Sequence, residues 1–475
     1  MAGQSGYVRS DFKYNLAKPP RCYGALAQAG DAVIPTAPIQ NNSQHSSGLR
    51  HSFVRGELAR VRRARSAQRL AAIILVASIF AYPLLGTLVV FTDFTSLFAS
   101  VPVRLFVVFS SALLVIRTKH RRNNFSLGML YLFWAIYALR LIMDYWGADI
   151  PGTDIDGIFF LATCVIPVIA ITRVPGGDWN EALIARWLAV SGALICAFAL
   201  LPLMSGVGTS RSLFEETGRL SFDTVNPITY GHVAVTTIVG AIVSLRRAKR
   251  VKQRLLWMGC IIVAAPVLYL AGSRGPALAL AACLASFLLL LTSTKRFVLP
   301  VLSISIVAML CASLLNLDST FWQHFFSFEN DPSTLERIFL QINAIEQFLN
   351  NPLLGSAHVE LQTLSYPHNP LIEAGMATGV LGFLLFAILS VQMAFRGWWQ
   401  LRHGETLIPL LGLQYLLGAQ FSGNLSQSAA MWILMAMIFS RGKRMSFGNT
   451  LVHLDGLSKI TTGHNFIHRH KRDSY

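Results

Sequence analysis

Charged side chains are scarce in this sequence. Asp, Glu, Lys and Arg make up 13% of the 475 residues, whereas hydrophobic residues make up 53%. A soluble domain usually carries about a quarter charged residues, so this composition argues against a soluble protein. Acidic residues are fewer than basic residues, and the formal net charge is +17. The basic residues cluster between apolar runs, without a nucleic-acid-binding module or an aromatic-interleaved basic face, so we expect no nucleic-acid partner.

The sequence also has few cysteines and no recognisable signal peptide. The sequence holds six cysteines and no Cys-x-x-Cys pair, a pattern that predicts neither disulfides nor cysteine metal clusters. Residues 1–69 lack the charged start and apolar core of a signal peptide. Their polar composition, with scattered Gly, Pro, Ser and Asn, predicts a mostly disordered tail that ends in a basic run.

What the sequence does contain is a series of long apolar runs. Roughly 20 residues cross the hydrocarbon core of a bilayer as a helix, so these runs predict an all-α polytopic membrane protein of about twelve transmembrane helices. The expected spans are 70–91, 101–116, 126–146, 157–172, 182–204, 229–245, 255–271, 276–293, 297–316, 371–395, 406–420 and 427–440. They divide the chain into a tail (1–69), a bundle of spans 1–9 (70–316), a long loop (317–370), spans 10–12 (371–440) and a second tail (441–475).

The distribution of Lys and Arg predicts the orientation of these spans. Basic residues concentrate in the connections after even-numbered spans, as in Arg117–Arg122 and Arg246–Arg254, and in the C-terminal tail. Connections after odd-numbered spans carry few basic residues. Because cytoplasmic loops are enriched in Lys and Arg, we expect both termini in the cytoplasm and the long loop on the outer, periplasmic face.

Four arginines nevertheless fall in outward connections. Arg211 and Arg219 lie in the loop 205–228, Arg274 lies in a tight turn, and Arg337 lies in the long loop. Each could be a lipid-headgroup anchor or a partner in a loop ion pair. Arg274 differs, because the short Gly-Ser-Arg-Gly turn between two spans holds its guanidinium at the membrane surface, which suits the binding of an anion.

The long loop carries a helical pattern and a histidine. Ser333-Thr334-Leu335-Glu336 fits a capping box, and apolar residues at helical spacing as far as Leu349 predict an amphipathic helix at the outer interface or packed on the bundle. Further on, His368 stands between Pro367 and Pro370. Histidine titrates near neutral pH, so His368 is the natural proton acceptor, although a cap or a headgroup contact is an alternative reading.

The order of these motifs resembles a known family. It comprises Gly218-Arg219, the turn at 272–275, Asn351-Pro352-Leu353-Leu354-Gly355, the segment His368–Gly375 and Gly379-Val380-Leu381-Gly382. This order is similar to the O-antigen ligase and Wzy-type polymerase superfamily of bacterial cell-envelope glycosyltransferases. The long N-terminal tail and the prolines at 276, 367 and 370 depart from the family pattern.

The resemblance implies a metal-independent, inverting glycosyltransferase of the bacterial inner membrane. It would move a glycan from undecaprenyl diphosphate to a polysaccharide or lipid A–core acceptor on the periplasmic face, with no cofactor, in contact with membrane lipids. Arg219 and Arg274 would bind the diphosphate, since guanidinium pairs with phosphate oxygens bidentately. His368 would be the general base. Supporting roles are expected for Arg337, Asn369 and Glu373. Polymerase and ligase are not distinguished.

Two other readings stay open. Asp154 and Asp156 have the Asp-x-Asp spacing with which some membrane glycosyltransferases hold a divalent cation. A transporter or flippase of lipid-linked glycan is the alternative function, because transporters place ionisable groups inside the membrane. The candidates for such groups are Arg140, Asp144 and Arg186, which lie near span ends. Arg140 and Asp144 are four residues apart and could simply pair with each other.

Overall fold

The computed structural model describes residues 43–89, 96–118, 124–147, 150–174, 179–205, 219–222, 225–290 and 332–441. The chain divides into two units, 1–57 and 58–475, and everything that follows concerns the second apart from the start of the first helix. The predicted ninth span (297–316) and Arg211 lie outside the described residues.

Helices make up nearly all of the described structure, which confirms the all-α prediction for this part of the chain. Their bounds are α1 (Ser43–Val89), α2 (Ser96–Arg117), α3 (Phe125–Trp146), α4 (Thr153–Phe159), η1 (Phe160–Val165), α5 (Ile166–Ile171), α6 (Glu181–Ser205), α8 (Pro227–Arg247), α9 (Val251–Ala271), α10 (Arg274–Leu290), α13 (Pro332–Asn350), α14 (Pro370–Arg402), α15 (Leu407–Ser422) and α16 (Ala429–Ser440). Within the described residues, eight helical segments are long and apolar enough to cross a membrane, with α4, η1 and α5 counted as one. Shorter apolar helices lie at α10, α15 and α16.

The first span differs from the prediction. Helix α1 already begins at Ser43, and its candidate membrane span runs over Val61–Val89. The last part of the predicted disordered tail is therefore helical. The stretch 57–69 is rich in Arg and Ala and contains neither Gly nor Pro, so nothing in it ends the helix that continues from the span.

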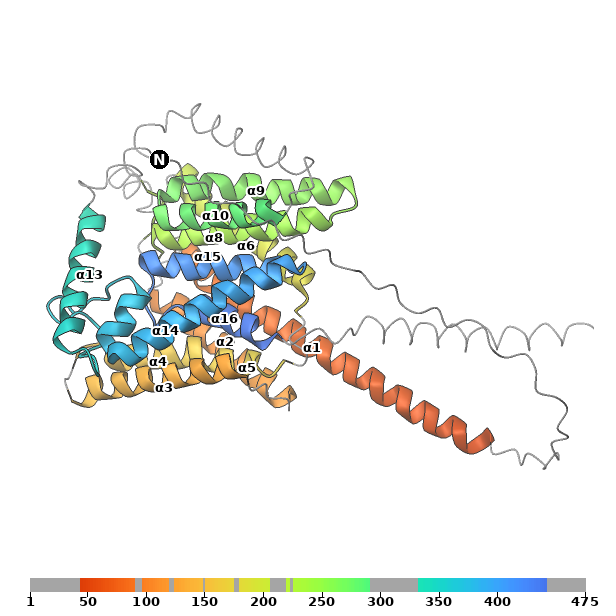
Figure 1. The fold of residues 1–475 in the computed structure, drawn as a ribbon. Coiled ribbons are helices and arrows are strands. Elements are labelled where there is room, and N and C mark those ends of the chain that lie inside the picture. The colour runs from red at the N-terminus through yellow and green to blue at the C-terminus, as the bar shows by residue number, and fades with distance from the viewer. Residues whose placement is uncertain are drawn as a thin grey trace, which may run out of the picture. The chain divides into compact units, whose positions relative to one another are not determined.

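The helices pack as two groups on either side of α15 and α16. One group comprises α6, α8, α9 and α10, and the other comprises α2, α3, α4–η1–α5 and α14 (Figure 1). Helix α15 contacts α8, α10 and α14, while α16 contacts α3, α5 and α14. Helix α16 is buried along nearly its whole length. The two short helices thus form the centre of the bundle rather than its lipid-facing surface.

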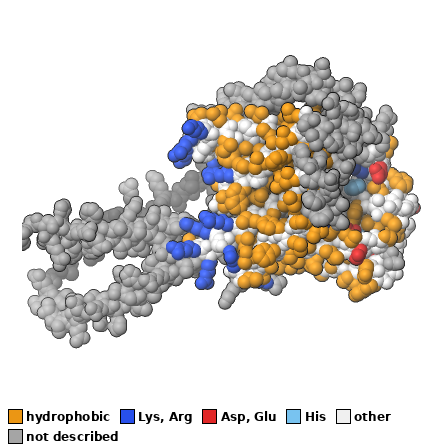
Figure 2. Space-filling view, turned by 180° about the vertical axis from the view of Figure 1, so that it is seen from behind, with side chains coloured by type: hydrophobic (Ala, Val, Ile, Leu, Met, Phe, Trp, Pro, Cys, Tyr) orange, Lys and Arg blue, Asp and Glu red, His pale blue; other side chains and the backbone are white. Residues whose placement is uncertain are grey.

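The two ends of the bundle differ in charge. Figure 2 shows Lys and Arg side chains gathered at one end of the apolar band, with acidic and His side chains at the other. The basic end includes the C-termini of α2 and α8, at Arg117 and Arg247. The N-terminus of α8 and the C-terminus of α9 lie at the opposite end, where the chain passes through Arg219 and Arg274.

Helix α14 is interrupted, and the loop before it fills the interruption. Gly379 has φ 68° and ψ −165°, outside the helical region. The N–H of Val380 donates to the Pro352 carbonyl (2.7 Å), and the N–H of Ser356 donates to the Met376 carbonyl (2.9 Å). A Cβ at Gly379 would lie 2.2 Å from the Leu353 carbonyl oxygen. The glycines of the Asn-Pro-Leu-Leu-Gly and Gly-Val-Leu-Gly motifs therefore allow the loop backbone to enter the helix.

The predicted amphipathic helix is present as α13, and it ends at Asn350 before Pro352. Leu340 and Ala344 are buried against the bundle. A second apolar stripe faces away from it and is exposed, comprising Leu335, Ile338, Ile342, Ile345 and Leu349. The helix therefore packs on the bundle with one face and presents apolar side chains with another.

Candidate functional site

Arg219 and Arg274 lie close together at the end of the bundle opposite to the basic end. The N–H of Leu220 donates to the Leu270 carbonyl (2.7 Å), which ties the segment of Arg219 to the end of α9. The Arg219 side chain covers Gly272, where a Cβ would come within 3.4 Å of its Cγ. Arg274 follows two residues later as the first residue of α10. Two distant parts of the sequence thus bring two guanidinium groups to one turn.

Arg337 joins them from the long loop. Arg274 Nη1 donates to Thr334 Oγ1 at the start of α13 (3.2 Å). One turn along α13, Arg337 Nη1 donates to the carbonyl of Phe421, near the C-terminus of α15 (3.1 Å). Helix α13 therefore holds a third arginine beside the other two, and we call Arg219, Arg274 and Arg337 the arginine cluster.

His368 reaches the same end of α15. It precedes Asn369, whose side chain caps α14 by accepting from the N–H groups of Leu371 (3.0 Å) and Ile372 (3.1 Å). The Asn369 amide also donates to the Gln420 carbonyl (3.1 Å). His368 has φ 55°, a left-handed conformation that is rare for residues other than glycine and is often associated with functional sites.

The surroundings of His368 favour its neutral form. Burial lowers the pKa of His368 below its ordinary value, and the positive charge of Arg337 lowers it further. A hydrogen bond to the backbone of Ser422 and the charge of Glu336 act in the opposite direction and do not outweigh these effects. A ring N–H held by a backbone carbonyl fixes the tautomer and leaves the other ring nitrogen as an acceptor. His368 is thus equipped to take a proton.

Glu373 lies elsewhere. It is fully buried on the first turns of α14 and faces α3, where it accepts from the Tyr137 hydroxyl (2.8 Å). Its other oxygen accepts from the N–H of Leu425 in the turn between α15 and α16 (2.9 Å). Glu373 therefore joins α14 to α3 and to the turn between α15 and α16 rather than facing the arginine cluster.

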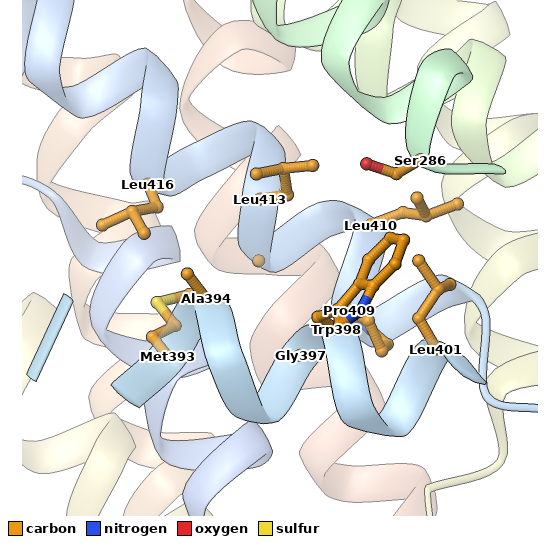
Figure 3. A pocket seen from close by; sticks show the side chains of 11 residues that line it. Ser286, Met393, Ala394, Gly397, Trp398, Leu401, Pro409, Leu410, Leu413 and Leu416 are labelled. Atoms are coloured by element: carbon orange, nitrogen blue, oxygen red, sulfur yellow. The ribbon is translucent and has the colours of Figure 1, made fainter. Parts of the chain in front are cut away.

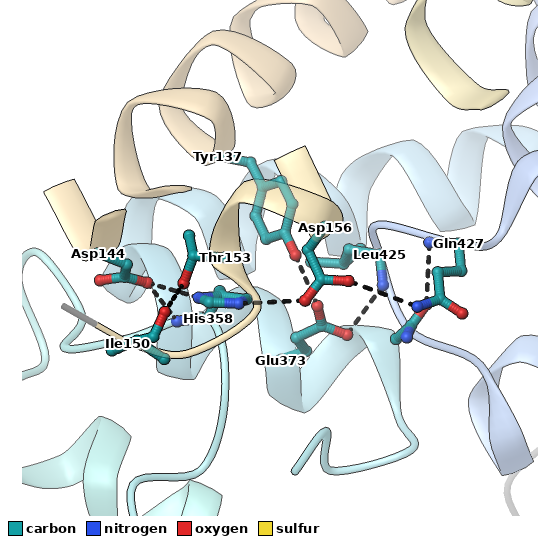
Figure 4. Close-up of polar contacts among 10 residues, drawn as sticks. Tyr137, Asp144, Ile150, Thr153, Asp156, His358, Glu373, Leu425 and Gln427 are labelled. Atoms are coloured by element: carbon teal, nitrogen blue, oxygen red, sulfur yellow. Dashed lines mark hydrogen bonds and ion pairs between the residues drawn. The ribbon is translucent and has the colours of Figure 1, made fainter. Parts of the chain in front are cut away.

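A buried network around His358 lies next to Glu373 (Figure 4). Both the backbone N–H and ring Nδ1 of His358 lie 2.8 Å from Asp144 Oδ2 on α3. Asp144 Oδ1 pairs with Arg140 Nη2 (2.6 Å), as their spacing suggested. On the other side, His358 Nε2 lies 3.5 Å from Asp156 Oδ2 on α4. The sequence did not point to His358, because its partners are more than 200 residues away.

The charges of this network determine the protonation state of His358. Burial alone would lower its pKa, but hydrogen bonds and charges from Asp144 and Asp156 outweigh burial and raise the pKa to about 9. His358 is therefore an imidazolium at neutral pH. Two cations, Arg140 and His358, face two carboxylates, and this pairing makes their burial tolerable. The network attaches the loop 351–369 to α3 and α4.

The two carboxylates of the Asp-x-Asp motif, Asp154 and Asp156, have different surroundings. Asp156 faces His358 and the amide of Gln427 (3.5 Å), whereas Asp154 is exposed to solvent. Among the described residues, no group of three or more His, Cys, Asp or Glu side chains has a geometry that could hold a metal ion.

An apolar cavity of about 100 Å³ lies far from these residues (Figure 3). It is enclosed by α10, α14 and the first half of α15, with Ser286 as its single hydroxyl-bearing side chain and Met393, Leu410 and Leu413 among its apolar ones. It offers no group for acid–base or phosphate chemistry and is not a candidate active site.

One family model matches part of the chain. Residues 259–387 match the family model described as O-antigen ligase. The match confirms the predicted family resemblance. The O-antigen ligase segment contains Arg274, Arg337 and His368 together with His358, while Arg219 and Asp144 lie before it. No curated protein matches the chain. The match supports membrane glycan transfer in general, by a glycosyltransferase-like enzyme acting on lipid-linked glycans in a bacterial membrane.

Proposed function

We propose that this protein transfers a glycan from undecaprenyl diphosphate to a polysaccharide or lipid A–core acceptor on the periplasmic face of the inner membrane, with both termini cytoplasmic. The proposal rests on one observation: the arginine cluster and His368 converge at the end of α15, opposite to the end where the other basic residues gather. The O-antigen ligase match supports the same reaction class.

The positive charge of the arginine cluster matches the negative charge of the diphosphate leaving group. When the glycosidic bond breaks, its electron pair stays with the diphosphate oxygen, and negative charge develops there. Arg219 and Arg274 would bind these oxygens and stabilise the departing anion without any change in their own protonation. Arg337 contributes charge at the same end of the bundle and, after burial, is the second cause that lowers the pKa of His368.

His368 is placed to take the proton of the acceptor hydroxyl. The acceptor hydroxyl would attack the anomeric carbon from the face opposite to the diphosphate, and its proton would pass to the free ring nitrogen of His368. One displacement of this kind inverts the anomeric centre and needs no covalent intermediate. The donor's own sugar–diphosphate bond supplies the driving force, so neither ATP nor a divalent cation is required.

The test uses purified protein in liposomes with a lipid-diphosphate glycan donor, an acceptor and a chelator. Wild type should release lipid diphosphate and form product. His368→Ala should lose about 10²–10⁴-fold in turnover, the usual contribution of a general base, with donor binding retained. His403→Ala is the matched control, because His403 lies at the opposite end of α14 and should leave turnover unchanged. Transport of intact lipid-linked glycan without bond cleavage would favour a flippase instead, and loss of wild-type activity in chelator would point to Asp154 and Asp156.

A further inference from the structure

Helix α2 carries an arginine inside its candidate membrane span. The span runs over Ser100–Arg117, and Arg104 lies one helical turn after its first residue, which is about 6 Å along the helix. The other end of the span, at Arg117, belongs to the basic end of the bundle, so Arg104 is near the end that carries the candidate site. A charged side chain within a span is costly, and it usually pairs with another charge or marks a functional site.

Arg104 has no acidic partner among the described residues. Arg140 on α3, six residues before the end of its own span, pairs with Asp144 (2.6 Å). None of the ion pairs in the described part of the chain includes Arg104. Tyr82 on α1 lies close enough to act on its charge, but it is no carboxylate. The positive charge of Arg104 is therefore not balanced by any described side chain.

The neighbours of Arg104 hold its guanidinium in place and leave it accessible. Arg104 Nη1 donates to Ser100 Oγ (2.8 Å), which directs the side chain toward the end of the span. The guanidinium carbon lies 3.3 Å from the centroid of the Phe159 ring, so the group stacks on that ring. Arg104 is partly exposed, and none of its nitrogens is buried without a partner. Since a guanidinium has five N–H donors, the remaining ones are open to an outside acceptor.

The accessible side of Arg104 adjoins the apolar outer surface of α2. Val101, Leu105 and Phe109, at neighbouring positions of the helix, are exposed apolar side chains. Such a surface faces lipid in a membrane span, and the guanidinium lies near the level where the span begins. The anion within its reach is therefore the phosphate of a lipid headgroup. Guanidinium matches phosphate through paired N–H donors, and the Ser100 hydroxyl, which accepts from Arg104, still has its own proton to donate.

We propose that Arg104, with Ser100 and Phe159, forms a binding site for the phosphate of a lipid in the leaflet on the side of the candidate site. Its residues come from α2 and α4, whereas the arginine cluster belongs to other parts of the chain, so the two anion sites are separate. Two kinds of lipid carry such a phosphate. A membrane phospholipid would be a structural lipid, and a lipid-linked glycan would be a substrate held at a second point. The binding itself does not depend on the proposed function, and the experiment separates the two sources.

The experiment measures lipid binding to delipidated protein in detergent by native mass spectrometry. The probes are phosphatidylglycerol, undecaprenyl diphosphate and, as the control without phosphate, diacylglycerol with the same acyl chains as the phosphatidylglycerol. Arg104→Gln removes the charge, and Ser100→Ala, which removes only a hydroxyl, keeps the test decisive if Arg104→Gln does not fold. Arg186→Gln is the matched control, because Arg186 is exposed and lies five residues after Glu181, which pairs with Arg247 at the basic end.

We expect Arg104→Gln to weaken the binding of a phosphate lipid by about tenfold or more, the usual effect of losing charge-assisted hydrogen bonds. Ser100→Ala should weaken it severalfold, and Arg186→Gln should bind as wild type does. A loss confined to phosphatidylglycerol assigns the site to a structural phospholipid, a loss of one bound undecaprenyl diphosphate assigns it to the lipid-linked glycan, and a loss of both shows that the phosphate alone is recognised. The site is refuted if Arg104→Gln and Ser100→Ala bind both phosphate lipids as wild type does, or if wild type binds diacylglycerol as tightly as both.

Discussion

The protonated state of His358 makes the stability of this protein depend on pH. Its pKa is about 9 in the folded protein, compared with 6.5 for an ordinary histidine. Because the folded pKa is raised, the stabilisation is fully present below pH 6.5 and is lost as the pH rises through about 9. At about 1.4 kcal/mol per pH unit, the shift corresponds to about 3 kcal/mol, which is large for a single side chain.

The perturbation that tests this is His358→Gln, which keeps a polar side chain of similar length and removes the titration. For a protein of 475 residues we expect the wild-type unfolding temperature to fall by roughly 3 °C between pH 7 and pH 10. The substituted protein should start lower at pH 7 and show little further change. His403→Gln, at an exposed position, should keep the wild-type slope.

The measurement is thermal unfolding in detergent at each pH. Unfolding is monitored as the fraction of protein that stays monodisperse after heating. It needs no substrate, so it is independent of the proposed reaction. A wild-type stability that does not fall between pH 7 and pH 10, or a His358→Gln protein that falls just as steeply, would refute the pairing of a protonated His358 with Asp144 and Asp156.

Three further predictions follow from the arginine cluster, the interrupted helix and the charged ends. Arg274→Lys keeps the charge but loses the planar fork, so turnover should fall by about 10²-fold or more with normal membrane insertion; full activity would contradict bidentate phosphate binding. Gly379→Ala places a Cβ against the Leu353 carbonyl and should lower thermal stability strongly, whereas Gly259→Ala, with open space around it, should not. A reporter inserted near Asp331 should read periplasmic and one after Arg444 cytoplasmic, and equal signals from both would overturn the orientation.

The apolar runs predicted most of the helices because each run is long enough that helix formation follows from composition. The charge distribution predicted one side of the membrane for Arg219, Arg274 and His368, and in the structure all three lie at the same end of the bundle. The contact between His358 and Asp144 could not be predicted, since 214 residues separate them and each has only generic neighbours in the sequence. The interruption of α14 could not be predicted either, because Gly379 lies within an apolar run and its conformation depends on Pro352 and Leu353, which are distant in the sequence.

The loop that enters α14 has a consequence for how the site is assembled. Its start is hydrogen-bonded to residues 376–380 of the helix, and its end becomes the first turn of that same helix, so residues 352–380 form a closed ring of backbone. Closing a ring of this length costs roughly 3 kcal/mol of chain entropy on folding, so little freedom remains to be lost when a substrate binds. His368 is therefore held in its position before the donor or acceptor arrives, and substrate binding energy is available for the reaction rather than for ordering the loop.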